Sequence, residues 1–320
     1  MEIFIAIIQI LAGSVLLYFG ADYLVRGAVM LSKKAGLSSL VIGLTVVAFG
    51  TSMPEMVISL NAAVNDKPDI SLGNIVGSNI CNIGLIMGLC ALIRPLTGDR
   101  SLLKLDIPFL CVISLLLAGV CIFTGGIERI IGILFLLLLA LYLFYCIKNG
   151  KNDPEDLPDE VKEEAKGIVA KHLLLFAILF VGCGLGALVF GADLFVKGAV
   201  TTARMLHVSE AVIGLTLIAL GTSLPELATS LVAAIKGESG IAAGNVIGSN
   251  IFNILAIMGV TPLVMPVHAQ GIDGLDLGIM LAFTFALIPI LLIGPRIGRI
   301  KGGVLLLGYI AYMIYLGTGH

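Results

Sequence analysis

The chain has 320 residues, of which 58% are hydrophobic and 12% are charged, and its mean hydropathy is +1.10. Soluble domains carry about 25% charged residues, so this composition excludes an ordinary soluble protein and predicts several membrane-spanning segments. The formal net charge of −2 provides no basic surface for nucleic acid, and neither a nucleic-acid motif nor an obligate protein partner is indicated.

Apolar segments of about 17–25 residues, long enough to cross a bilayer, follow one another along the chain. The first, at 3–25, follows Glu2 instead of a basic segment. It is also too long for the apolar part of a signal peptide, so we expect a transmembrane helix. The others lie near 39–63, 70–93, 105–124, 127–147, 169–191, 210–235, 241–265, 276–294 and 301–317. They predict an all-α integral membrane protein with ten transmembrane helices, five in each half of the chain.

The two halves of the chain are copies of each other. Residues 50–55, GTSMPE, recur as GTSLPE at 221–226, and the same offset of 171 residues relates Asn79 to Asn250. The halves align without a gap over most of their first three helices, which indicates a tandem duplication. The predicted units are a first five-helix repeat at 1–147 with its motif at 43–88, a linker at 148–168, and a second repeat at 169–320 with its motif at 214–259.

Basic residues are distributed unevenly between the predicted loops, and positively charged loops face the cytoplasm. The loop after the first helix, for example, is predicted to contain Arg26, Lys33 and Lys34. We therefore expect the charged linker at 148–168 to be cytoplasmic and both termini to lie outside the cell. Because each half has an odd number of helices, the halves must have opposite orientations and form an inverted repeat. Fifteen lysines and arginines lie on the cytoplasmic side, against four on the other: Lys67, Arg129, Lys197 and Arg204.

Glu55 and Glu226 are ionisable side chains at membrane depth, where a carboxylate is costly and indicates a functional site. Inverted repeats superpose near the bilayer midplane, so we expect the two acids to approach each other there. Two carboxylates alone in a low dielectric would repel, and one would take up a proton. A divalent cation would balance both charges. The structural alternative is one protonated acid bonded to a neighbour, but the repeated proline and hydroxyl context favours a cation site.

Pro54 and Pro225 interrupt the second and seventh predicted helices, because proline has no N–H for the carbonyl four residues earlier. We therefore expect these two helices to be discontinuous, with free backbone oxygens near 48–51 and 219–222 that line a site. Together with the carboxylates, such oxygens suit calcium and sodium and not zinc or copper. Hydroxyl oxygens are added by Thr51, Ser52, Thr222 and Ser223.

A second segment is repeated downstream, as GNIVGSNICN at 73–82 and GNVIGSNIFN at 244–253. Ser78 and Asn82 lie one helical turn apart and share a face, as do Ser249 and Asn253. Polar side chains on that face can reach ions held by the glutamate-bearing helices. The glycines of each segment have the four-residue spacing that favours close helix packing.

Other polar and small residues have structural interpretations. Asn74 and Asn79 fit either hydrogen bonding between helices or ion contact, and the sequence leaves both open. Asp22 and Asp193 each precede a basic residue by four positions, which predicts interfacial ion pairs. The glycines of GCGLG at 182–186 are expected to serve helix packing, because no strand precedes them. The cysteines show no metal-ligand spacing and are expected to be buried free thiols: Cys81, Cys90, Cys111, Cys121, Cys146 and Cys183.

The paired GTSxPE and GSNIxN segments resemble the alpha-repeats of the sodium/calcium exchanger family, within the calcium/cation antiporter superfamily. The likeness covers nearly the whole chain, with ten helices, inverted halves and a linker after the fifth. It implies a multi-pass cell-membrane antiporter that exchanges Na+ for Ca2+ by alternating access at a shared midplane site. The ions would be substrates, with no cofactor and no catalytic residue, and helices 1 and 6 would form a sliding gate.

The resemblance also implies roles for individual residues. Glu55 and Glu226, with Thr51 and Thr222, would form a central calcium site. Asn82 would line the middle of the cluster, and Asn253 holds the matching position, where some relatives carry an aspartate. Flanking sodium sites would use Ala48, Ser52 and Ser78 from one half, with Ala219, Ser223 and Ser249 from the other.

Four alternatives to sodium/calcium exchange have to be compared with it. The cluster has two carboxylates, where relatives with an aspartate at the position of Asn253 have three, and this difference leaves a potassium requirement open. A proton/calcium antiporter would protonate Glu55 and Glu226 instead of binding sodium. The Thr-Ser-x-Pro context favours sodium. A cation channel would conduct without a counter-ion, and an intramembrane hydrolase has no serine, metal or aspartate-pair constellation to support it.

Overall fold

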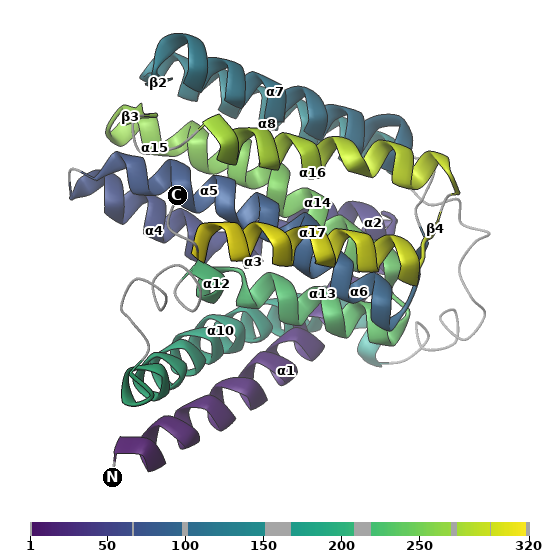
Figure 1. Ribbon diagram of the computed structural model, residues 1–320. Coiled ribbons are helices and arrows are strands. Elements are labelled where there is room, and N and C mark those ends of the chain that lie inside the picture. Colours follow the sequence, from purple (N-terminus) through teal and green to yellow (C-terminus); the bar gives the residue numbers. More distant parts are fainter. Residues whose placement is uncertain are drawn as a thin grey trace.

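Figure 1 shows the computed structural model, which describes residues 2–65, 67–97, 102–150, 168–207, 219–269, 274–294 and 296–317. These residues are almost entirely helical. They contain eight helices long and apolar enough to cross a membrane, or nine when the bent pair Ser39–Thr51 and Met53–Val64 is taken as one span. Each of the ten predicted segments overlaps a helix, although the segment at 210–235 is described only from residue 219 onward.

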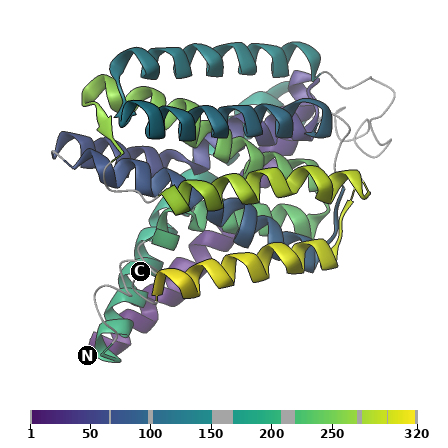
Figure 2. The same cartoon turned by 45° about the horizontal axis from the view of Figure 1, so that its top comes forward.

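Two helices are much longer than predicted. α1 (Glu2–Ala35) has 34 residues and α10 (Ile168–Met205) has 38, so α1 extends over about 50 Å against a hydrocarbon core of about 30 Å. The apolar stretch of α1 ends near the expected boundary, but lysine and arginine are good helix formers and continue the helix. The prediction that Arg26, Lys33 and Lys34 lie in a loop is therefore wrong. Figures 1 and 2 show that α1 and α10 lie side by side and that this pair is inclined to the other helices.

A seam of glycines holds α1 against α10. A Cβ added at Gly184 would lie 2.8 Å from the carbonyl oxygen of Gly20, and one added at Gly20 would lie 2.9 Å from that of Gly184. Only glycine allows two helix backbones to approach so closely. Gly182 and Gly186 have nothing within 4 Å of an added Cβ. The predicted packing role of the 182–186 segment is thus confirmed for Gly184 alone.

The second and seventh predicted helices are broken, as expected. The first break bends the chain by 43° at Ser52, and Ser223 has nearly the same backbone angles, with φ −81° and ψ 5° at Ser52 and φ −87° and ψ 4° at Ser223. The proline of each motif lies two residues later, in the first turn of the next helix, where its missing N–H is tolerated. The segments are α2 (Ser39–Ile42), η1 (Gly43–Val47), α3 (Ala48–Thr51) and α4 (Met53–Val64), then α12 (Ala219–Thr222) and α13 (Leu224–Lys236).

The helices that carry the second motif contain a wider π-helical turn, which the sequence did not predict. In both halves this turn begins at the last asparagine of the motif, Asn82 or Asn253. Single π-turns inside α-helices occur frequently at functional sites. The segments are α5 (Pro68–Cys81), η2 (Asn82–Met87) and α6 (Gly88–Ile93), then α14 (Ser239–Phe252), η6 (Asn253–Ile257) and α15 (Met258–Val264).

The remaining helices lie on the outside of the layer that the two broken helices and the two helices with π-turns form (Figure 1). They are η3 (Leu102–Asp106), α7 (Ile107–Thr124), α8 (Arg129–Asn149), α16 (Gly274–Leu292) and α17 (Arg299–Gly317). Two small antiparallel sheets join the halves: β1 (Leu96–Thr97) pairs with β4 (Arg296–Ile297), and β2 (Gly126–Ile127) pairs with β3 (Val267–His268). An offset of 171 residues relates β1 to β3, and β2 to β4 within one residue, and each sheet contains one strand from each half.

Asp22 and Asp193 form the predicted ion pairs, but in different surroundings. Asp22 lies 2.8 Å from Arg26 Nε, and Asp193 lies 2.7 Å from Lys197 Nζ. The Asp22 side chain is only 8% exposed and also pairs with Lys236 at the end of α13, whereas Asp193 is 53% exposed. Asp22 therefore ties α1 to one of the broken helices.

Replacing Asp22 with asparagine is expected to lower the melting temperature in detergent. The change leaves a largely buried site with an unpaired Lys236, and loss of a charged hydrogen bond of this kind is worth about 1.5–3 kcal/mol. Asp193→Asn is the matched control, because exposed ion pairs contribute less than about 1 kcal/mol. Equal shifts for the two variants would contradict a special role for Asp22.

Two further predictions have a mixed or untested outcome. Five of the six cysteines are buried free thiols, but Cys183 is exposed on α10, so the expectation of burial is wrong there. Cys183 follows Gly182, where an added Cβ would meet nothing within 4 Å, so the helix does not pack against its partner at this position. The predicted linker at 148–168 lies outside the described residues from 151 to 167.

Candidate functional site

Glu55 and Glu226 lie in the first turns of α4 and α13, directly after the two breaks. Both side chains are 0% exposed. Ser52 Oγ donates a hydrogen bond to Glu226 Oε1 at 3.0 Å, and Ser223 Oγ donates one to Glu55 Oε1 at 3.2 Å. Each acid is thus bound by the serine of the opposite half, and the two acids share one polar cluster.

Serines of the neighbouring helices complete the first ring of contacts. Ser249 Oγ of α14 donates to Glu226 Oε1 at 3.5 Å, and Ser78 Oγ of α5 lies 3.4 Å from Ser223 Oγ. Thr51 Oγ1 lies 3.5 Å from Ser249 Oγ. All of these side chains are buried, so the two motifs of each half meet around the carboxylates.

Asn245 and Asn74 tie the broken helices to their neighbours. Asn245 Nδ2 donates to the backbone oxygen of Glu226 at 3.3 Å and to Ser230 Oγ at 2.9 Å. Asn74 makes the matching bonds, both at 3.2 Å, in the first half. Thr51 Oγ1 also donates to Asn245 Oδ1 at 3.0 Å. Asn74 thus forms the hydrogen bonds between helices that the sequence allowed, and its contact with an ion stays a prediction.

Two asparagine pairs cross between the halves. Asn82 Nδ2 donates to Asn250 Oδ1 at 2.9 Å, and Asn253 Nδ2 donates to Asn79 Oδ1 at 3.0 Å. All four are at most 1% exposed. Asn79 was left open between hydrogen bonding and ion contact, and it forms a hydrogen bond between helices, whereas Asn250 was not predicted to have a role. Their spacing was the available sequence signal. Asn79 precedes Asn82, and Asn250 precedes Asn253, by three residues, so each pair shares a helix face.

Four buried oxygens of this cluster have no hydrogen-bond donor in the described residues: Glu55 Oε2, Glu226 Oε2, Asn82 Oδ1 and Asn253 Oδ1. A buried acceptor without a donor is costly, and a native structure rarely keeps one without a reason. Two carboxylate and two amide oxygens together suit a hard cation such as calcium or sodium. These four oxygen ligands therefore fit the cation site predicted from the sequence.

The backbone oxygen at Ala48 differs from expectation. It accepts the N–H of Ser52 at 3.0 Å and lies 3.4 Å from Thr51 Oγ1, so it is not the free carbonyl predicted. The Ser52 amide comes two residues before the proline and still closes the turn. In the second half the N–H of Ser223 bonds to Leu220 instead, at 3.1 Å, and the role of Ala219 stays a prediction.

Comparison with known proteins finds likeness over nearly the whole chain. Residues 5–148 and 176–318 match the family described as "Sodium/calcium exchanger protein". The chain is 34% identical to the sodium/calcium exchanger MaX1 of Methanosarcina acetivorans, over 96% of this chain and 97% of that one. It is 36% identical to the inner membrane protein YrbG of Escherichia coli, over 96% and 95%. A solved structure of the sodium-calcium exchanger NCX_Mj superposes with a TM-score of 0.84 at 35% identity, over 98% and 99%.

Proposed function

The chain belongs to the sodium/calcium exchanger family, and from this membership and the geometry of the site we propose that it is a secondary active antiporter. It exchanges Na+ for Ca2+ across the membrane by alternating access at one shared site. The single observation that carries the proposal is the crossed pair of hydrogen bonds that joins each buried glutamate to the serine of the other half. Neither half has a complete site alone.

The calcium site is centred on the two glutamates. Their two unpartnered Oε2 atoms supply the negative charge that one Ca2+ balances, and the free amide oxygens of Asn82 and Asn253 are further neutral ligands. The hydroxyls of Thr51 and Thr222 complete the set. The flanking sodium sites use the serines of both motifs, Ser52, Ser78, Ser223 and Ser249, and in the second half the backbone at Ala219.

Competition for the same oxygens couples the two fluxes. One Ca2+ or several Na+ ions can neutralise the two carboxylates, whereas an empty pair of charges in a closed, low-dielectric site is strongly unfavourable. The protein therefore changes its exposed side only when an ion set is bound. This requirement prevents free leakage and separates the mechanism from that of a channel.

The α1/α10 pair acts as the gate that slides across this site. Side chains of α10 lie over both breaks: a Cβ added at Gly50 would lie 2.6 Å from the methyl carbons of Leu185, and one added at Gly221 would lie 2.7 Å from a methyl carbon of Val196. A single helix thus covers the residue next to each motif threonine. Movement of the pair along its own axis uncovers one break while the other stays closed.

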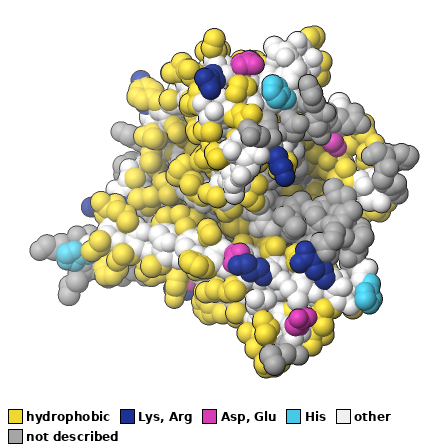
Figure 3. Space-filling model, turned by 90° about the vertical axis from the view of Figure 1, so that its left-hand side faces the viewer, with side chains coloured by type: hydrophobic (Ala, Val, Ile, Leu, Met, Phe, Trp, Pro, Cys, Tyr) yellow, Lys and Arg dark blue, Asp and Glu magenta, His cyan; other side chains and the backbone are white. Residues whose placement is uncertain are grey.

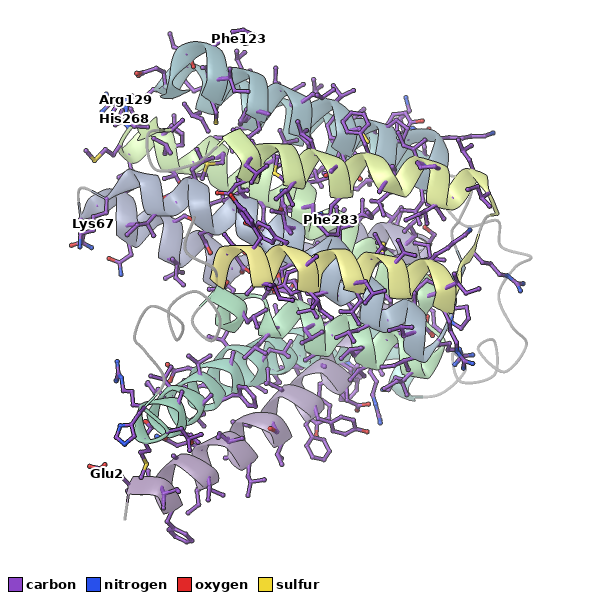
Figure 4. The ribbon with its side chains drawn as sticks, in the orientation of Figure 1. Glu2, Lys67, Phe123, Arg129, His268 and Phe283 are labelled. Atoms are coloured by element: carbon purple, nitrogen blue, oxygen red, sulfur yellow. The ribbon has the colours of Figure 1, made fainter. Side chains whose placement is uncertain are left out.

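The two halves form an inverted repeat of five helices each, and both termini lie outside the cell. Figure 4 places Glu2, Lys67, Arg129 and His268 at the same end of the helix bundle, whereas β4, with Arg296, lies at the other. Figure 3 looks onto the first of these ends and shows basic, acidic and histidine side chains among hydrophobic ones. That arrangement suits the outer face of a multi-pass protein in the cell membrane, with the residues 148–168 in the cytoplasm.

Sodium is expected to displace calcium from the purified protein. In detergent at fixed pH and ionic strength, bound radioactive Ca2+ should fall as Na+ replaces a large organic cation, because both ions need the same carboxylate oxygens. Potassium is the matched control, and equal displacement by K+ would favour a potassium-dependent exchanger. Calcium binding that follows pH and ignores Na+ would contradict sodium coupling.

A further inference from the structure

Asn82 and Asn253 present a problem that an aspartate would not have. The two ends of an amide differ, because Oδ1 accepts hydrogen bonds and can bind a cation, whereas the Nδ2 group only donates and repels one. Both side chains are buried, at 1% and 0% exposure. For either to serve as a cation ligand, another group must hold the amide with its oxygen toward the ion.

For Asn82 that group is Asn250, whose own orientation is set by a contact with the backbone of Asn79. Asn250 Nδ2 lies 3.5 Å from the carbonyl oxygen of Asn79, and a backbone carbonyl can only accept a hydrogen bond. This contact places the NH2 end of Asn250 against Asn79. Its Oδ1 is then turned toward Asn82, whose Nδ2 must face it as the donor, at 2.9 Å.

The remaining end of Asn82 is the oxygen, and it has no donor in the described part of the chain. Ser78, one turn earlier on the same helix face, contacts the serine that binds Glu55. The orientation passed from the Asn79 backbone through Asn250 thus leaves an acceptor on the face that reaches the glutamates.

We propose that Asn250 is a positioning residue that turns the Asn82 amide oxygen toward the transported cation. The inference rests on the proposed cation site and extends it by a residue outside the ligand set. Asn79 does the same for Asn253 through its Oδ1, at 3.0 Å. Asn79 Nδ2, however, has no partner in the described residues, so the second orientation is held less firmly and Asn250 has the larger effect.

The test uses calcium binding to the purified full-length protein, measured by equilibrium binding of radioactive Ca2+. Asn250→Ala should weaken calcium binding about tenfold, as loss of an outer-shell partner typically does. In an Asn82→Asp background both ends of residue 82 are oxygens, so the orientation of residue 82 no longer matters. Asn250 Oδ1 also has no donor to accept from there, and Asn250→Ala should weaken calcium binding by less than about twofold. Asn149→Ala, which removes an asparagine on the exposed end of α8, should leave binding unchanged.

Each outcome supports or overturns the proposal. Equal losses in both backgrounds would mean that Asn250 only packs helices, and unchanged binding by Asn250→Ala alone would show that it orients nothing. Loss of calcium binding in Asn82→Asp would exclude residue 82 as a ligand. If Asn250→Ala does not fold, as judged by gel filtration, Asn79→Ala with and without Asn253→Asp gives the equivalent test. Failure of the unsubstituted protein to bind calcium would instead contradict the proposed function.

Discussion

Glu55→Gln and Glu226→Gln are each expected to abolish calcium transport in proteoliposomes while the protein remains folded. Glutamine keeps the size of the side chain and the oxygen that accepts the opposing serine, at 3.2 Å for Glu55 and 3.0 Å for Glu226. It removes half of the negative charge that balances Ca2+ in a site with no exposure to solvent. Breaking a buried charge pair costs about 3–5 kcal/mol, which reduces affinity by roughly a hundredfold or more.

Glu128→Gln is the matched control for both variants. Glu128 precedes α8 and is exposed, so its charge lies away from the cluster and transport should be retained. Gel filtration and melting temperature establish that each variant is folded. If both glutamine variants at positions 55 and 226 transported calcium at the normal rate, the site assignment would be wrong.

Gly184→Ala is expected to disrupt the α1/α10 pair and with it both stability and transport. The added methyl group would lie 2.8 Å from the carbonyl oxygen of Gly20 and 2.6 Å from the backbone nitrogen of Leu24. Neither backbone atom can turn aside as a side chain would, so the helices must separate. Overpacking of this kind costs about 1–3 kcal/mol, and we expect a lower melting temperature together with slower exchange.

Gly186→Ala provides an unusually close control, because it lies on the same helix two residues away. Its added methyl group meets nothing within 4 Å, and alanine in a helix is more stable than glycine by about 0.5–1 kcal/mol. Gly186→Ala should therefore melt at or above the normal temperature and exchange ions normally. The gate proposal would be weakened if Gly184→Ala behaved in the same way as Gly186→Ala.

Local signals in the sequence predicted most of the scaffold. The length of the apolar segments is enough to find the helices. The prolines at positions 54 and 225 indicated both breaks, because proline cannot form the backbone hydrogen bond to the preceding turn. The repeat likewise predicts that Glu55 and Glu226 approach each other, because inverted halves superpose near the midplane. The lengths of α1 and α10 were missed because no local signal ends a helix where its residues merely become polar. Arg26 continues the helix as well as any apolar residue would.

The contacts that cross between the halves could not be predicted. Pairing of Asn82 with Asn250, and of Asn253 with Asn79, depends on the rotation and register of two helices from different repeats, and no spacing within one motif determines these. The π-turns at Asn82 and Asn253 and the two small sheets between the halves were not predicted either. The expectation of a free carbonyl at Ala48 failed for a local reason, because the Ser52 amide remained available to it.

Calcium flux into proteoliposomes under separately imposed sodium, potassium and proton gradients tests the shared cation site most directly. We expect an outward sodium gradient alone, at equal pH and potassium on both sides, to drive calcium uptake, and the Glu55→Gln protein to show none. Uptake driven by the proton gradient and indifferent to sodium, or calcium movement without any counter-ion, would contradict sodium/calcium exchange at this site.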